Sequence, residues 1–232
     1  MKKYFRTLIP CLLAYTVAHN THAQCDNAYY EYRDGTSMEM TSYDDKGKVN
    51  GYSNFTYTNF ESSGNHTQAT VKLILKDKKG KPSYEGEYYV HCEEGTIKYE
   101  LTAMMANAVA GLENMEFEVE SEDLEIPPSL NVGQKLKGAS MTMKIVNMPI
   151  PMNYETIITN RKVDANETIT TPAGTFDCVK ITFDSEFRMM GRSVNKSKNT
   201  MWLAKKAGTI KTAFYKANGD LQGYQELTSF KE

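Results

Sequence analysis

Short stretches of alternating apolar and polar residues, separated by glycine-containing turns, recur along the chain and constrain its fold more than any other feature. Alternation with a period of two places successive side chains on opposite faces of a strand. Glycine-containing turns at regular intervals are typical of hairpins. Strand-like runs occupy residues 38–40, 54–60, 71–75, 84–90, 97–101, 116–120, 141–145, 154–160, 164–170, 177–187, 193–203, 209–216 and 222–230. The pattern predicts antiparallel meanders.

Two segments interrupt this pattern. Residues 102–115 are rich in Ala and Met without alternation, which predicts one short helix. Residues 126–134 include Pro127 and Pro128, which lack amide donors and so cannot belong to a central strand. We interpret this second segment as a crossing between two halves. Because no low-complexity linker separates the halves, we expect a mainly β fold: one domain over residues 24–232, built from two sequential meanders.

Two of the predicted hairpins share a spacing. Tyr, Gly, an aliphatic residue, Gly and Tyr follow at the same offsets in residues 43–52 and 215–224. Duplication of a half-sheet would produce this repeated spacing. The shared chemistry of good hairpins, in which glycine takes positive φ, would also produce it and is the interpretation that we favour.

The N-terminus has the pattern of a secretory signal peptide. Lys2, Lys3 and Arg6 precede a mostly apolar run at residues 8–18, and small residues at 21 and 23 precede Gln24. We expect residues 1–23 to be cleaved and the protein to be periplasmic or secreted, because the apolar run is too short for a membrane anchor. Gln24 before Cys25 argues against a lipoprotein. No later run of 18 apolar residues occurs, so no transmembrane segment is expected in the mature chain.

Charge narrows the possible partners. Without the three basic residues of the signal, 24 basic and 29 acidic side chains remain, a formal charge of −5. Nucleic-acid binding normally requires a basic patch, and membrane-surface binding a polybasic cluster. Neither partner is therefore expected.

Cysteine and histidine are too sparse to indicate catalysis. Cys25, Cys92 and Cys178 remain after cleavage, so we expect one disulfide and one free thiol, with all three pairings open. His66 and His91 are the histidines of the mature chain, and neither belongs to a metal-binding or nucleophilic motif. We therefore expect no catalytic residue, no metal, no cofactor and no enzymatic activity.

Several motifs, in order, resemble a known family. They are the hairpin at 45–48, the segments 128–136 and 171–181, and the ending 208–212 followed by 224–227. Together they are similar to the TapB-like exported proteins of Gram-negative bacteria, a domain family of unknown function. The resemblance implies a curved antiparallel sheet or half-open barrel, broadly like the half-barrels of lipoprotein carriers. It implies no catalytic residue.

Methionines suggest where a ligand could bind. Met is flexible and polarizable and suits adaptable apolar surfaces. Six methionines lie on the predicted helix or around the proline-rich stretch that follows residue 145: Met104, Met105, Met141, Met143, Met148 and Met152. We take these six as candidate ligand-binding residues, with ordinary core packing as the open alternative.

These observations support three functional hypotheses. The first is an exported, non-catalytic binding protein that holds a lipid, another apolar small molecule or a partner segment in the concave face of its sheet. The second is a structural or interaction protein of the envelope, whose partner is another envelope protein. The third and weakest is a hydrolase with an unrecognised catalytic arrangement.

Overall fold

The computed structural model describes residues 27–30, 33–63, 66–101, 116–147 and 152–232. Within these ranges the chain forms one antiparallel sheet of thirteen strands and no α-helix. The strands are β1 (Ser37–Asp44), β2 (Val49–Ser63), β3 (His66–Asp77), β4 (Pro82–Glu93), β5 (Thr96–Tyr99), β6 (Phe117–Glu122), β7 (Leu124–Ile126), β8 (Ala139–Ile145), β9 (Met152–Thr171), β10 (Gly174–Met189), β11 (Arg192–Ala204), β12 (Gly208–Lys216) and β13 (Leu221–Lys231). The predicted helix at 102–115 lies outside the described residues.

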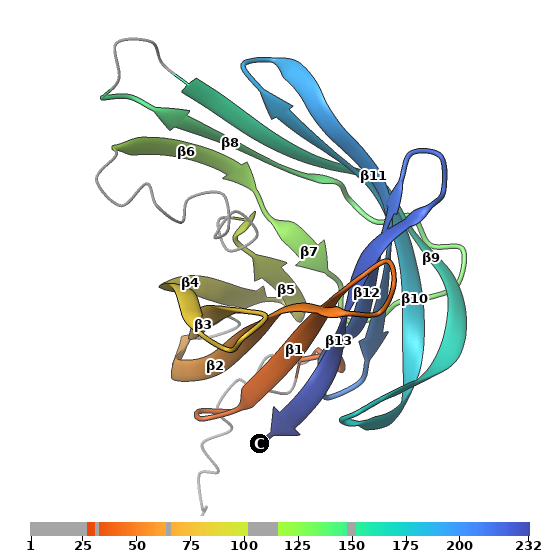
Figure 1. Cartoon of the computed structure of the whole chain (residues 1–232). Helices are drawn as coiled ribbons and strands as arrows, with labels where there is room; N and C mark the ends of the chain where they lie inside the picture. The colour runs from red at the N-terminus through yellow and green to blue at the C-terminus, as the bar shows by residue number, and fades with distance from the viewer. Residues whose placement is uncertain (1–26, 31–32, 64–65, 102–115, 148–151) are drawn as a thin grey trace, which may run out of the picture.

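Two sequential meanders make up the sheet, as the sequence predicts. Strands β1 to β5 follow one another on one side, strands β8 to β13 on the other, and β13 pairs with β1 to join them. The sheet curves strongly, so that its two halves face each other across the interior (Figure 1). The fold is thus nearly all β and nearly closed into a barrel-like shape.

One continuous stretch of chain reaches both edges of the sheet. β6 pairs with β8 at one edge, whereas β7 pairs with β5 at the other. Asp123 is the single residue between them. The two edges of the curved sheet are therefore tied together by the backbone itself (Figure 1).

The prediction of two separate strands is wrong for the region of β9. The sequence suggests separate strands at 154–160 and 164–170, but the structure has one continuous 20-residue strand. Asn160 lies at φ 53°, and the register with β10 shifts beside it, because Asp184 pairs with Thr159 while Thr182 pairs with Lys162. A bulge absorbs the irregularity without ending the strand.

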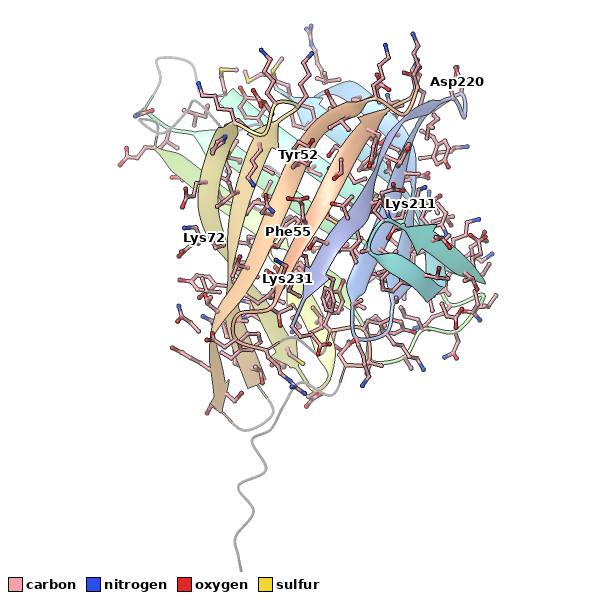
Figure 2. All side chains as sticks on the ribbon, turned by 60° about the horizontal axis from the view of Figure 1, so that its bottom comes forward. Tyr52, Phe55, Lys72, Lys211, Asp220 and Lys231 are labelled. Atoms are coloured by element: carbon pink, nitrogen blue, oxygen red, sulfur yellow. The ribbon has the colours of Figure 1, made fainter. Side chains whose placement is uncertain are left out.

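The sheet has an inner face, defined by the buried residues Met40, Leu73, Ile158 and Ile181, and an outer face. Paired residues of an antiparallel sheet share a face, and faces alternate along each strand. Tyr52, opposite Thr41, therefore lies on the outer face, three residues from the inner-facing Phe55. Figure 2 labels both residues on β2, beside β1 and β13.

Most of the inner face is packed as a single core. This core includes Val71 and Leu73 of the first meander and Val163 and Ile181 of the second, each at most 4% exposed. Residues from both halves of the sheet thus exclude water between them, which is the main source of stability in such a fold.

The N-terminal residues that the structure describes pack against this main core. The Asn27 side chain donates hydrogen bonds to the carbonyls of Gly95 (2.8 Å) and Ile126 (3.0 Å). Tyr29 and Tyr30, which follow, are buried, and the Tyr30 ring meets Tyr99 edge-on at 5.3 Å between centroids. This segment therefore links the β4–β5 turn to β7.

Candidate ligand-binding site

A second, smaller apolar cluster lies apart from the main core. Its buried members are Leu101, Ala139, Met141, Met143 and Ile158. Half-buried side chains packed against it are Leu124, Tyr154, Phe183 and Phe187. β8, β9 and β10 supply most of these residues, which places the cluster on one half of the curved sheet (Figure 1).

Strand register aligns this cluster on the inner face. Ala139 on β8 pairs with Ile158 on β9, and Met143 pairs with Tyr154. Ile158 in turn pairs with Ser185 on β10. Phe183 and Phe187 are two residues on either side of Ser185, so they project from the same face. Alternation along β8 explains why Met141 and Met143 point inward together.

Burial changes along β10 where the main core ends. Cys178, Val179 and Ile181 are buried, but every residue from 182 to 188 is half-buried. β9 changes in the same way, since residues 152–157 are half-buried and Ile158 is buried. A filled interior would bury its inward side chains fully. The inner face at this end therefore retains accessible apolar surface.

Two aromatic rings are prominent in that surface. Tyr154 and Phe187 are stacked, with 6.2 Å between ring centroids and 21° between ring planes. The Tyr154 hydroxyl lies 3.9 Å from the Met152 sulfur, to which it donates. Flat rings beside a thioether provide a broad, deformable apolar surface of the kind that binds lipophilic molecules.

A short polar row adjoins the cluster on the same face. Ser185 and Ser197 pair across β10 and β11, with 2.7 Å between their hydroxyl oxygens. Asn199 pairs with Phe183, and its Nδ2 donates to the Ser185 hydroxyl at 2.9 Å. Asn199 is 3% exposed, and its Oδ1 has no hydrogen-bond partner. The row thus places unused hydrogen-bonding capacity beside the apolar surface.

The ion-paired groups near these strands lie on the opposite face, whereas the exposed Lys216 pairs with Ser197 and so shares the inner face. Glu186 accepts two hydrogen bonds from the Arg188 guanidinium, at 2.9 and 3.2 Å. This contact, followed by a hydrogen bond from Ser193, lowers the pKa of Glu186 to about 2. Lys196 lies 3.6 Å from the same carboxylate. The outer face carries an ion-pair network, whereas the inner face between Ile158 and Asn199 carries neutral side chains.

One buried cation lies elsewhere, near the edges of the sheet. Arg161, at the β9 bulge, is 2% exposed, and its guanidinium donates to the carbonyls of Lys137 (2.7 Å) and Glu125 (2.9 Å). Burial lowers its pKa to about 10, against the opposing influence of Tyr30 and Glu125. Its hydrogen bonds connect β9 to β7, so we assign it a structural role.

The predicted methionines have different positions. Met141 and Met143, on β8, are 1% and 3% exposed, and Met152 at the start of β9 is half-buried. Met104, Met105 and Met148 lie outside the described residues. Tyr154, Phe183, Phe187 and Asn199 were not singled out by sequence reasoning, because alternation does not say which parity faces inward.

Cys92 and Cys178, the cysteines that the structure describes, belong to the main core and not to the candidate site. Cys92 is disulfide-bonded, and its partner lies outside the described residues, as does Cys25. Cys178 is a buried free thiol, and burial raises its pKa to about 11. A thiol with a raised pKa is a poor nucleophile at neutral pH.

His66 and His91 are neighbours in space. The rings of His66 and His91 have centroids 5.7 Å apart, and His91 Nε2 lies 3.5 Å from a Glu100 carboxylate oxygen. Because the two histidines are far apart in the sequence, the sequence alone does not indicate that their rings are close. Even so, no group of three or more His, Cys, Asp or Glu side chains in the described part of the chain has a geometry that could hold a metal ion.

Together the fold and this site define a class: an antiparallel β protein, nearly closed into a barrel, with half-buried apolar side chains on part of its inner face. The chain belongs to the DUF3108-like family, whose model matches residues 33–227. That is a family of domains of unknown function, as the sequence-based resemblance implies. The matching family does not carry the TapB-like name, so that finer resemblance stays a prediction. Comparison with curated proteins finds no match.

Two solved structures share the fold. One, from Bacteroides fragilis, is described as an exported protein with a YmcC-like fold; it has a TM-score of 0.73 and 17% identity, covering 89% of this chain and 100% of that one. The other, described as a lipoprotein from Parabacteroides distasonis, has a TM-score of 0.72 and 20% identity, covering 88% of this chain and 99% of that one. At these identities the likeness shows the fold alone.

The described residues also contain no helix with the length and apolar character to cross a membrane.

Proposed function

We propose that this chain is an exported, non-catalytic binding protein that holds a lipophilic ligand against the inner face of β8, β9 and β10. The observation that carries the proposal is the half-buried aromatic surface around Tyr154 and Phe187, next to the buried Met141 and Met143. When a ligand covers apolar surface that water still reaches, that surface is removed from water, which contributes favourable free energy to binding.

Export is supported by two independent observations. Residues 1–23 have the charge and apolar pattern of a cleaved signal peptide. The structural relatives from Bacteroides fragilis and Parabacteroides distasonis are described as an exported protein and a lipoprotein. A lipophilic cargo in the periplasm or beyond needs a carrier or receptor, because its free solubility is low. The chain would bind without chemistry, since its inner face between Ile158 and Asn199 offers no nucleophile–base arrangement.

The first test measures binding of N-phenyl-1-naphthylamine, a dye whose fluorescence rises in apolar surroundings. We expect saturable binding to the purified mature chain, and Phe187→Ser should weaken it about tenfold, which corresponds to about 1.4 kcal/mol. Phe187 is half-buried, so the variant should fold. Organic extraction of protein purified from its native host should also release a lipid that mass spectrometry identifies.

Tyr52→Ser is the matched control. Tyr52 is a half-buried aromatic residue on the outer face of β2 (Figure 2), so its loss should leave dye binding unchanged. Absence of dye binding by a folded protein would overturn the proposal. Equal losses in the Phe187 and Tyr52 variants would overturn the assignment to the inner face.

A further inference from the structure

Asn199 carries an unused hydrogen-bond acceptor beside the proposed apolar site. Its Oδ1 is buried without a partner, although its Nδ2 is held by Ser185 at 2.9 Å. A buried polar atom without a partner costs about 1–3 kcal/mol and calls for an explanation. Turning the amide over would bring Oδ1 to the Ser185 hydroxyl but would give up the Nδ2 bond, so one polar atom of the amide stays unpaired in either orientation.

The neighbouring hydroxyls add a spare donor. Ser185 and Ser197 share one hydrogen bond, in which either oxygen can be the donor. Ser185 also accepts from Asn199, so one of the two hydroxyl protons remains for another acceptor whichever way the shared bond points. The row therefore presents one acceptor and one donor together.

Strand pairing places this polar row next to the apolar surface. Asn199 pairs with Phe183, which packs on the Met141–Met143 cluster, and Ser185 pairs with Ile158, a buried member of that cluster. All of these side chains share the inner face. Phe183 and Phe214, the cross-strand neighbours of Asn199, are half-buried and are the rings that a ligand would displace to reach Oδ1.

From this arrangement we infer that the ligand is an amphiphile with a neutral head that both donates and accepts a hydrogen bond, such as a hydroxyl or an amide. Its head bonds to Asn199 Oδ1 and to the serine pair, while its apolar part covers Phe183 and Phe187. The inference rests on the proposed function and adds the chemistry of the ligand's polar end. The three side chains of the row are neutral, which favours a neutral head over an ionised one. The nearest cation by register is Lys216, which pairs with Ser197 but is exposed at the end of β12, so an anionic head would be drawn toward solvent rather than to Asn199.

Two probes that differ in one donor test this inference. Dodecanol and dodecyl methyl ether have similar apolar chains, but only the alcohol can donate to Asn199. Each is used to displace N-phenyl-1-naphthylamine, and the ratio of the two half-displacement concentrations is taken within each variant, so that changes in dye affinity cancel. We expect the alcohol to be favoured about fivefold in the unmodified chain, the value of one net hydrogen bond.

Asn199→Leu should bring the ratio close to one, because it removes the acceptor while keeping the branching and the number of heavy atoms of the side chain. Ser185→Ala, a smaller change, should lower the ratio by freeing the amide, and it carries the test if the first variant does not fold. Asn54→Leu is the matched control: Asn54 Oδ1 is also buried and unpaired, but Asn54 pairs with Glu39 on the outer face. Its ratio should equal that of the unmodified chain.

The outcomes separate the two proposals. Dye binding with no preference for the alcohol, or with a preference that survives both Asn199→Leu and Ser185→Ala, overturns the inference and leaves the proposed function standing. Failure of the dye to bind the folded, unmodified chain overturns the proposed function itself. Stronger displacement by dodecanoate than by dodecanol at neutral pH would also overturn the inference, because it would assign the row to an anionic head.

Discussion

The guanidinium of Arg161 on β9 donates a 2.9 Å hydrogen bond to the main-chain carbonyl of Glu125 on β7. In strand order, β7 is at one edge of the sheet, whereas β9 lies close to the other edge. The side chain therefore spans the region where the two edges approach, and its second bond, to the Lys137 carbonyl, holds the segment that follows β7. Closure of the fold thus depends on a buried cation as well as on the β6–β7 backbone.

Arg161→Met should destabilise the protein by about 2 kcal/mol. The change leaves two carbonyl groups without their donors, at about 1–3 kcal/mol each, and part of that loss is offset because a charge is no longer buried. Urea unfolding of the purified chain, expressed as residues 24–232, measures the difference. Lys162→Met, which removes an exposed cation from the next position, should change stability by less than about 0.5 kcal/mol. Equal stability of the Arg161 variant and the unmodified chain would refute the structural role.

Much of the fold could be predicted from local pattern. Alternation and turn glycines indicate where strands begin and end. Because short turns bring consecutive strands side by side, the two meanders could be predicted from these local signals. The division of residues 117–126 between two edges could not be predicted. The apolar positions change parity between β6 (117 and 119) and β7 (124 and 126), but nothing local assigns the two parts to opposite edges. Their separation at Asp123 depends on long-range pairing with β8 and β5.

The candidate site was only partly predictable for a related reason. A strand's alternation defines two sets of residues, but the register with distant strands decides which set faces inward. Met141 and Met143 could therefore be suspected from composition, whereas Phe183 and Asn199 needed the β10–β11 register. The β9 bulge that turns Arg161 into the interior has no local sequence signal beyond Asn160, a residue that tolerates positive φ.

The repeated hairpin spacing corresponds to a repeated packing requirement. A Cβ added at Gly223 would lie 2.5 Å from the Tyr43 carbonyl oxygen, and one at Gly51 would lie 2.7 Å from the Lys76 carbonyl oxygen. Gly223→Ala and Gly51→Ala should each destabilise the protein by about 1–3 kcal/mol, because a neighbouring strand must shift. Thermal or urea unfolding measures the effect, with the exposed Gln222→Ala as control. An unchanged midpoint in both glycine variants would contradict the close approach.

Glu186 should contribute to stability in acid. Its pKa is lowered from 4.5 to about 2, chiefly by hydrogen bonds from Arg188 and then from Ser193. A carboxylate whose folded pKa is depressed stabilises the fold fully above its unfolded pKa and loses that contribution as the pH falls through the folded value. The melting temperature of the unmodified chain should therefore fall more than that of Glu186→Gln between pH 4.5 and pH 2. Glu118→Gln removes an exposed acid from β6 and serves as control; an identical pH dependence in Glu186→Gln would contradict the prediction.

The free thiol of Cys178 should react only when the sheet opens. Cys178 is 3% exposed, its Sγ lies 3.5 Å from the Phe176 carbonyl, and burial raises its pKa to about 11. Both access and thiolate formation are therefore suppressed at pH 8. Ellman's reagent should label the native protein, expressed as residues 24–232, slowly and at the rate of local opening, and should label it at once in urea. Cys178→Ser should abolish this labelling and so identify the thiol. Rapid stoichiometric labelling of the native chain that disappears in Cys178→Ser would show that β10 is accessible at this position, contrary to the packing described for the main core.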